Sequence, residues 1–415
     1  MSTMIESSPT ELLERARLIE PEIIGYRRHI HANPELSFKE TRTAAYVAEK
    51  LKSFGLAPKS GVGQTGVIVD IGEGAEAIAI RADMDALPIQ ESNDVPYCSK
   101  NEKVMHACGH DVHTACALGA ARLLADRPPA NGRIRIIFQP AEEATNSDGI
   151  SGAGLMLRDG ALDGIASVVA LHVFPEIAAG KIALRSGPVL AAADKFDLKI
   201  QGKGSHGAWP HLGVDAIAIA AQVVQAIQLV VSRRISALEP AVITIGGMRS
   251  TTFAPNIIAE AVEMTGTVRY FHKQTQPVLR REIENACRIA EALGGSYELR
   301  YISENPAVVN DQFVVAAVDA VARQMLGEES IEEASMHMGA EDFSFMSEQV
   351  PSCFIYLGAA IEGDQRMLHT SSFDVDEKAL SVGAALLTAS ALSLLRDACD
   401  NKAKRHALKP GAPCQ

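Results

Sequence analysis

Side chains that bind metals or move protons stand next to the ends of several apolar segments. Cys108 and His110 come just before a helical pattern, in His-Ala-Cys-Gly-His-Asp. Glu142 and Glu143 follow one apolar strand pattern, and His172 ends another. Thiolate, imidazole and carboxylate groups are the usual ligands of zinc and similar transition ions. Of two adjacent glutamates, one can bind a metal ion while the other transfers protons.

A further pair of carboxylates, Asp83 and Asp85, follows the apolar segment 77–81. A carboxylate behind a ligand histidine can fix the tautomer of that histidine. Each group alone has an ordinary structural explanation: a buried cysteine, surface glutamates, a core histidine, or a turn cap before Pro88. A single site for two metal ions accounts for all four groups together.

The elements between these groups predict how they meet. Apolar runs rich in Val and Ile indicate buried strands at 65–71, 77–81, 133–139 and 167–172. Amphipathic patterns predict helices at 41–54 and 112–125. This alternation is typical of an α/β domain with a mixed, largely parallel sheet. Ligands bind outside the carboxyl ends of the strands in such sheets, which is where the polar groups lie.

The pattern changes near Ala191, where an inserted domain is expected to begin. Its predicted elements, in chain order, are a strand at 195–201, a helix at 214–231, strands at 241–245 and 260–270, a helix at 276–293 and a strand at 296–302. This order predicts a two-layer α+β unit at 191–304.

The chain is then expected to return to the first domain. The predicted elements there are helices at 313–326 and 376–396 and a strand at 353–358. We therefore expect a discontinuous catalytic domain formed by 1–190 and 305–400, and a flexible tail at 401–415.

Composition limits the possible partners. Lys and Arg number 39 against 51 Asp and Glu, which gives a net charge of −12. Nucleic acid is not an expected partner, because phosphate binding needs a basic face. We find no apolar run near the ~20 residues that span a bilayer and expect no membrane partner. The polar N-terminus lacks a signal core. We expect a cytoplasmic protein whose seven cysteines are mostly reduced.

The chain resembles the family of dinuclear metal aminoacylases and carboxypeptidases, and within it the branch of hippurate hydrolases and indole-acetyl-amino-acid hydrolases. The matching stretches run in the expected order across nearly the whole chain. They are 81–88, 106–113, 139–143, 171–172, 202–206, 339–343 and 368–370.

The resemblance implies roles for individual residues. It implies that the ligands of two divalent ions (zinc, manganese, nickel or cobalt) are Cys108, His110, Glu143, His172 and His369. It also implies that Glu142 is the general base and that Asp85 supports a ligand from behind. The inserted domain is similar to the dimerisation domain of the family and predicts a homodimer. From that domain, His206 and Asn256 resemble residues that contact substrate, with His206 reaching the partner subunit's site.

Many members of the wider family carry His-x-Asp where this chain has Asp83-Met84-Asp85. Whether Asp83 contacts metal therefore stays open. The expected reaction is cleavage of an N-acyl amino acid into a carboxylic acid and a free amino acid. The alternatives are a metallo-dipeptidase or carboxypeptidase using the same site, a catalytically inactive protein that binds amino-acid conjugates, and a thiol hydrolase with Cys108 as nucleophile.

Overall fold

The computed structural model describes residues 7–407, with side chains to residue 400. These residues form two compact units. The larger lies within Met1–Val189, Val309–Ser335 and Phe345–Gln415, and the smaller is formed by Leu190–Val308 and Met336–Ser344. Segment 336–344 joins the smaller unit from a part of the chain that the sequence patterns assigned to the larger one.

The larger unit contains an eight-stranded sheet in the order β1-β2-β4-β3-β5-β16-β6-β15. Its strands are β1 (Lys59–Val62), β2 (Gly66–Glu73), β3 (Ala77–Asp83), β4 (Gly132–Gln139), β5 (Ser167–Ala178), β6 (Ile182–Leu184), β15 (Ile331–Glu333) and β16 (Ser352–Ala360). The four central strands, β4, β3, β5 and β16, pair in parallel. The predicted class, a mixed and largely parallel α/β sheet, is confirmed.

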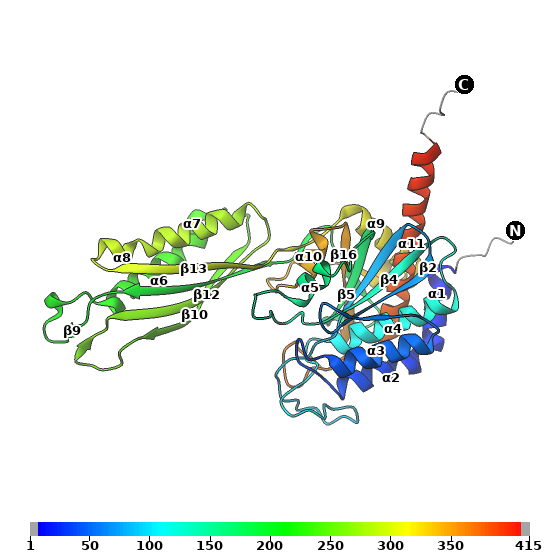
Figure 1. Ribbon diagram of the computed structural model, residues 1–415, viewed down its shortest axis with the longest axis horizontal. Coiled ribbons are helices and arrows are strands. Elements are labelled where there is room, and N and C mark those ends of the chain that lie inside the picture. The colour runs from blue at the N-terminus through cyan, green and yellow to red at the C-terminus, as the bar shows by residue number, and fades with distance from the viewer. Residues whose placement is uncertain (1–6, 408–415) are drawn as a thin grey trace, which may run out of the picture. The chain divides into compact units, whose positions relative to one another are not determined.

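Helices cover this sheet (Figure 1). They are α1 (Pro9–Leu18), α2 (Glu20–His31), α3 (Thr41–Ser53), α4 (His110–Asp126), α5 (Gly152–Arg158), α9 (Gln312–Leu326) and α11 (Lys378–Ala407). Every residue of β3 is buried, since a central parallel strand has helices on both faces. This explains its continuous apolar sequence. The helix α11 extends into the expected tail as far as Ala407, and residues 408–415 lie outside the described residues.

The smaller unit has a four-stranded antiparallel sheet in the order β10-β12-β8-β13. Its main elements are β8 (Ala192–Gln201), α6 (Ala216–Arg234), β10 (Ala241–Ser250), β12 (Ala261–Tyr270), α7 (Thr275–Cys287), α8 (Ile289–Ala292) and β13 (Ser296–Asn305). A short ribbon pairs β9 (Ser205–His206) with β11 (Ile257–Ile258). Further short elements of the chain are β7 (Gly187–Leu190), β14 (Val308–Asn310), α10 (Phe343–Ser347) and the 3₁₀ helices Pro210–Leu212 and Glu328–Ser330.

Two helices correct the expectation that no segment could span a bilayer. By length and composition alone, α6 and residues Lys378–Asp400 of α11 are long and apolar enough. The α11 segment is 83% buried, as a core helix is, whereas α6 is 33% buried. The buried residues of α6 repeat every three or four positions from Ala216 to Val230, so a single face of the helix packs on its sheet.

Candidate functional site

The polar groups singled out from the sequence come from three neighbouring strands and one helix end. β3 ends at Asp83, β4 ends just before Glu142, and α4 begins at His110. His172 lies within β5 rather than at its end, opposite Tyr356 of β16. Because β4, β3 and β5 are parallel neighbours, their carboxyl ends share one edge of the sheet.

Gly109 makes the sharp turn that brings Cys108 and His110 to the same place. Its backbone has φ +87°, a left-handed conformation that side chains disfavour. A Cβ atom at this position would lie 2.2 Å from Cγ2 of Val173. Glycine is therefore required both by the conformation and by the close approach of β5.

Five side chains bring their ligand atoms together. Sγ of Cys108 lies 3.4 Å from Nε2 of His172 and 3.2 Å from Nε2 of His369. Oε1 of Glu143 lies 3.3 Å from Nε2 of His369 and 4.0 Å from Nε2 of His110. Ligand atoms of Cys108, His110 and His172 lie within 4.8 Å of one another, as do those of Cys108, Glu143 and His369. We call these five residues the ligand cluster.

The chemistry of the ligand cluster fits divalent metal ions. Within the described part of the chain, Nε2 of His110 and Oε1 of Glu143 are buried and have no hydrogen-bond partner. Burying polar atoms in this way is unfavourable unless another group satisfies them. Thiolate, imidazole and carboxylate donors that face a common centre are the set that binds zinc and related ions.

The electrostatics of the ligand cluster reflect its crowding and, for Cys108 and His172, burial. Burial raises the pKa of the Cys108 thiol, and the Glu143 carboxylate raises it further. Burial is also the main cause that holds the pKa of His172 well below its ordinary value, and the neighbouring His113 adds to it. The neighbouring Cys108 thiol and Glu143 carboxylate raise the pKa of His369 to about 10.

Asp85 lies behind the ligand cluster and contacts three residues of the site, His110, Glu142 and Glu143. Its Oδ1 lies 3.2 Å from Nδ1 of His110 and accepts the Glu142 backbone N–H at 3.1 Å. Its Oδ2 accepts the Glu143 backbone N–H at 3.0 Å and the Ser37 hydroxyl at 2.6 Å. Burial would raise the pKa of Asp85, but the hydrogen bond from His110 and the other donors lower it overall. With its proton on Nδ1, His110 presents the Nε2 lone pair to the cluster.

Asp83 has other partners. Its Oδ2 accepts from Nη1 of Arg81 at 2.6 Å, and its Oδ1 lies 2.7 Å from Nδ1 of His113. Its nearest approach to a ligand-cluster nitrogen is 3.9 Å, from Oδ2 to Nε2 of His110. Nε2 of His113 in turn accepts the Val173 N–H at 3.0 Å. Asp83 therefore holds His113 against β5, although Asp83, His110 and His113 form a further close group of possible ligands.

Glu142 lies beside the ligand cluster. Its carboxylate is within 4.8 Å of the ligand atoms of His110 and Glu143. The preceding residue, Ala141, has φ +46°, and its N–H donates to Oε1 of Glu40 at 2.8 Å. This turn after β4 directs two consecutive glutamates to the same site, which explains why Glu142 and Glu143 are not surface residues.

His206 and Asn256 belong to the smaller unit, where the β9–β11 ribbon brings them together. His206 pairs with Ile257, and the Gly207 N–H donates to the Asn256 carbonyl at 2.7 Å. Nδ1 of the exposed His206 accepts the Ala208 N–H at 3.0 Å. Neutral His206 therefore carries its proton on Nε2, which is available as a donor.

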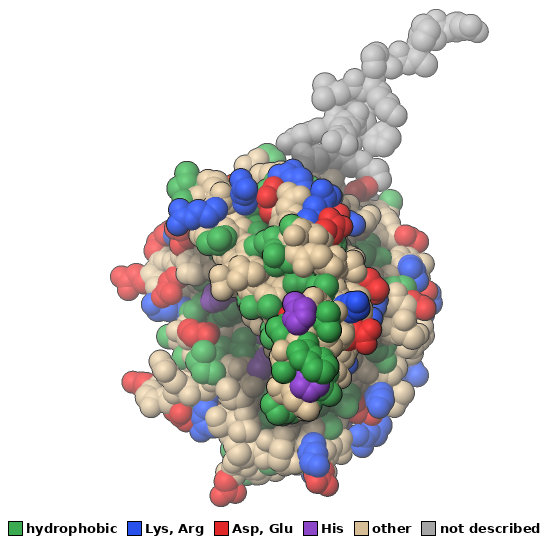
Figure 2. Space-filling model, turned by 90° about the vertical axis from the view of Figure 1, so that its left-hand side faces the viewer, with side chains coloured by type: hydrophobic (Ala, Val, Ile, Leu, Met, Phe, Trp, Pro, Cys, Tyr) green, Lys and Arg blue, Asp and Glu red, His purple; other side chains and the backbone are tan. Residues whose placement is uncertain are grey.

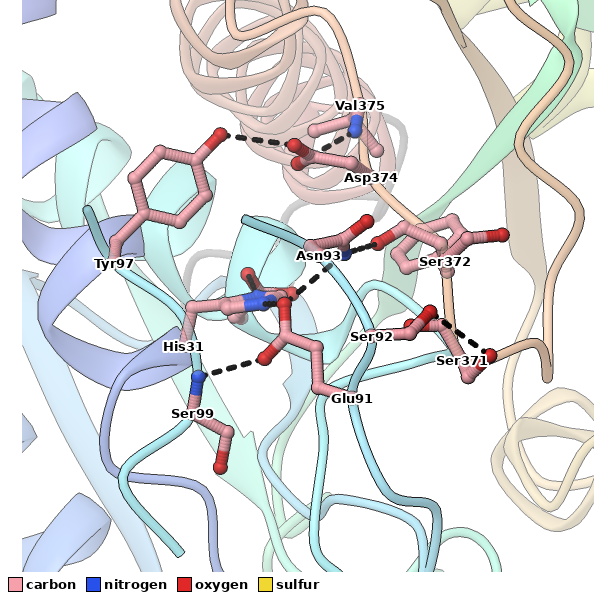
Figure 3. A network of polar contacts seen from close by, with 12 residues as sticks. His31, Glu91, Ser92, Asn93, Tyr97, Ser99, Ser371, Ser372, Asp374 and Val375 are labelled. Atoms are coloured by element: carbon pink, nitrogen blue, oxygen red, sulfur yellow. Dashed lines mark hydrogen bonds and ion pairs between the residues drawn. The ribbon is translucent and has the colours of Figure 1, made fainter. Parts of the chain in front are cut away.

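Sequence reasoning missed a buried charged network, of which Figure 3 shows His31, Glu91 and Asp374. Arg27 is fully buried and donates to Asp111 and Asp374. His31 is also buried, and its ring nitrogens contact Asp111 and Glu91. The first helices gave no catalytic signal, because Arg27 and His31 contact Glu91, Asp111 and Asp374, which lie at least 60 positions away in the sequence.

Comparison with known proteins identifies the family. Residues 79–393 match the peptidase family M20/M25/M40. The chain is 39% identical over 395 residues to N-acetyl-L-cysteine deacetylase of Bacillus subtilis (94% of this chain, 91% of that protein). It is 43% identical over 296 residues to an N-acyl-L-amino acid amidohydrolase of Geobacillus stearothermophilus (70% and 79%). It resembles the crystal structure of Bacillus subtilis YxeP, described as a dinuclear metal binding peptidase of the M20 family, with TM-score 0.80, 32% identity and 92% and 99% of the two chains covered. The chain therefore belongs to peptidase family M20/M25/M40 and is a hydrolase that acts on amide bonds.

Proposed function

We propose that this hydrolase cleaves the amide bond of N-acyl amino acids and uses two divalent metal ions. The observation that carries the proposal is the convergence of the five-residue ligand cluster beside a further carboxylate, that of Glu142. The relatives named as an N-acetylcysteine deacetylase and an N-acyl-amino acid amidohydrolase support this substrate class. Within it, the motifs of the branch favour hippurate-like, N-acetyl or indole-acetyl conjugates.

The ligand cluster would hold the metal ions: Cys108, His110, Glu143, His172 and His369. When bound, such ions lower the pKa of water from 15.7 to about 7 and polarise the amide carbonyl. The donor set suits zinc, manganese, nickel and cobalt. Metal availability as well as affinity decides which of these ions is bound.

The chain's own groups then have distinct tasks. Glu142 would accept the proton of the attacking water and donate it to the leaving amine. Asp85 holds the His110 tautomer and, through the two backbone N–H groups, the positions of both glutamates. His206 would donate from Nε2 to the developing oxyanion or to the substrate carboxylate, a kind of contact worth on the order of 10²–10³ in rate.

The test begins with metal removal. Dialysis against a chelator should abolish hydrolysis of N-acetyl, N-benzoyl and indole-acetyl amino acids, and a divalent ion should restore it. A thiol hydrolase using Cys108 would resist the chelator and be inactivated by iodoacetamide. A metallo-dipeptidase or carboxypeptidase would prefer dipeptides over the N-acyl panel. Full activity of protein shown by elemental analysis to be free of metal would refute the proposal.

We further propose that the protein is a homodimer in which His206 serves the partner subunit's site. Large apolar side chains are exposed near His206 and along α6: Trp209, Leu212, Ile217, Leu229 and Ile257. Figure 2 views the end of the smaller unit that carries β9, and hydrophobic side chains gather there together with histidines. Exposed apolar surface of this kind marks protein interfaces. A two-fold dimer would bury the same patch on both subunits.

Mixing two inactive variants tests the shared site. In dimers formed from His206→Ala and Glu142→Gln chains, one site would combine an intact His206 with an intact Glu142. We expect activity to return in the mixture and not in either variant alone. If the chains exchange subunits and no activity returns, His206 does not act across an interface.

A cytoplasmic location stays a prediction from the sequence.

A further inference from the structure

His369 differs from the other members of the ligand cluster in how it is supported. It lies in the connection between β16 and α11, outside any helix or strand. Its side chain is 54% exposed, and its backbone has φ +60°. Few non-glycine residues adopt this left-handed conformation, and they keep it only where the surrounding structure holds them. Its N–H donates to the Ala107 carbonyl at 2.8 Å, but the rest of the loop needs support from elsewhere.

The support comes from residues 91–99, which lie along residues 371–375 (Figure 3). The Ser92 N–H donates to the Ser371 carbonyl at 2.8 Å, and the two serine hydroxyls lie 3.1 Å apart. Nδ2 of Asn93 donates to the Phe373 carbonyl at 2.9 Å. These bonds join Ser92 and Asn93 to Ser371 and Phe373, which follow His369 in the loop. We call this contact the clasp.

The amide of Asn93 is the centre of the clasp. Besides the bond to Phe373, its Nδ2 donates to Oε1 of Glu91 at 3.0 Å. Its Oδ1 accepts from Nη1 of Arg366 at 2.7 Å. The same Arg366 nitrogen donates to the Ser372 carbonyl at 2.7 Å. One side chain therefore fixes the loop on both sides of His369, at positions 366 and 373.

The clasp rests on a rigid base that also reaches His110. Glu91 accepts the Ser99 N–H at 2.6 Å and lies 3.2 Å from Nε2 of the buried His31. Arg27, fully buried, donates to Asp374 at 2.7 Å and to Asp111 at 2.8 Å. Asp111 directly follows His110 at the start of α4. The two segments that carry His110 and His369 are thus bonded to the same guanidinium group.

We infer that Asn93 is a positioning residue for His369, and that through the clasp it sets how tightly the ligand cluster holds the metal ion bound by His369. This inference rests on the proposed metal-dependent function. The physical reason is that an exposed histidine on a loop must otherwise lose backbone freedom when it binds a metal ion. A loop fixed in advance has already lost that freedom, so binding is tighter.

The test compares Asn93→Ala with Asn33→Ala in the full-length protein. Asn33 is also in the larger unit and also donates its amide to a backbone carbonyl, that of His29 at 2.7 Å, but it lies outside the clasp. Metal affinity is measured as the dissociation constants of Co²⁺, by calorimetry or by competition with a chelator. Changes behind a ligand typically weaken metal binding about 10–100-fold. We expect such a rise in one dissociation constant for Asn93→Ala and none for Asn33→Ala.

A second background separates positioning from a general structural effect. If Asn93 acts through His369, Asn93→Ala should leave the remaining Co²⁺ affinity unchanged in a His369→Ala protein. An equal loss in both backgrounds would overturn the inference, as would a wild-type Co²⁺ affinity for Asn93→Ala. Arg366→Gln removes the other half of the clasp and replaces Asn93→Ala if that variant does not fold. Failure of the wild type to bind Co²⁺ would overturn the metal proposal as well, whereas wild-type binding with an unaffected Asn93→Ala would overturn the clasp alone.

Discussion

Replacing Asp85 by asparagine isolates the support of the ligand cluster from the ligands themselves. Asn has nearly the shape of Asp but offers one acceptor oxygen and one NH₂ donor in place of two acceptor oxygens. Oδ1 of Asp85 faces His110 Nδ1 and the Glu142 N–H, and Oδ2 faces the Glu143 N–H and the Ser37 hydroxyl. The two backbone N–H groups cannot accept, the hydroxyl can turn round, and His110 can accept at Nδ1 only by moving its proton to Nε2, the atom that faces the ligand cluster.

Either orientation of the amide therefore leaves a ligand without its hydrogen bond. An NH₂ group at the Oδ2 position opposes the Glu143 N–H, and one at the Oδ1 position opposes His110 and the Glu142 N–H. An unsatisfied donor at a buried position costs about 1–3 kcal/mol, which is roughly 5- to 150-fold in an equilibrium constant. Losses of about 10–100-fold in metal affinity are typical when a group behind a ligand is changed. We expect Asp85→Asn to weaken Co²⁺ or Zn²⁺ binding within this range.

The assay is metal titration against a competing chelator, with the melting temperature measured in parallel. Asp70→Asn is the matched control. Asp70 lies on β2 of the same sheet and accepts from Arg135 at 2.7 and 2.8 Å, but at the surface, where such pairs contribute about 0–1 kcal/mol. Metal affinity of Asp85→Asn equal to that of Asp70→Asn would refute the idea that Asp85 holds the cluster.

Three further predictions concern the site and its surroundings. Glu142→Gln should keep both metal ions and lose about 10²–10⁴ in kcat, whereas Glu143→Gln should lower the metal content; elemental analysis with the opposite result would reverse the two roles. Gly109→Ala should lower the melting temperature and the metal affinity, because its Cβ would lie 2.2 Å from Val173, whereas Gly25→Ala, with no atom within 4 Å of the added Cβ, should do neither. Burial would raise the pKa of Glu91, but the hydrogen bond from His31 and other donors lower it from 4.5 to about 2, so ionised Glu91 contributes stability above about pH 4.5 that is lost as the pH falls toward 2. The melting temperature of Glu91→Gln should therefore fall less steeply than that of the wild type between these pH values. Equal slopes for the two proteins would contradict the assignment.

Local sequence patterns were sufficient to predict most of the larger elements. Apolar runs at 77–81 and 133–139 predict β3 and β4, and the amphipathic pattern at 112–125 predicts α4. Parallel strands end at the same edge of a sheet, so the order of the elements already placed Asp85 and the two glutamates near one another. The types of these side chains then indicated a metal site, because few other environments suit buried thiolate, imidazole and carboxylate groups together.

The sequence could not show which distant loops complete the site. His369 follows no periodicity, and its contact with Cys108 joins residues 261 positions apart; it entered through family resemblance alone. The clasp, the buried Arg27 and the place of segment 336–344 in the smaller unit likewise had no local signal. Apolar periodicity in the sequence shows which face of an element is buried. This periodicity joins residues three or four positions apart in a helix and two positions apart in a strand. Hydrogen bonds between loops depend on the whole chain being folded, so tertiary structure alone decided which polar side chains position the ligands.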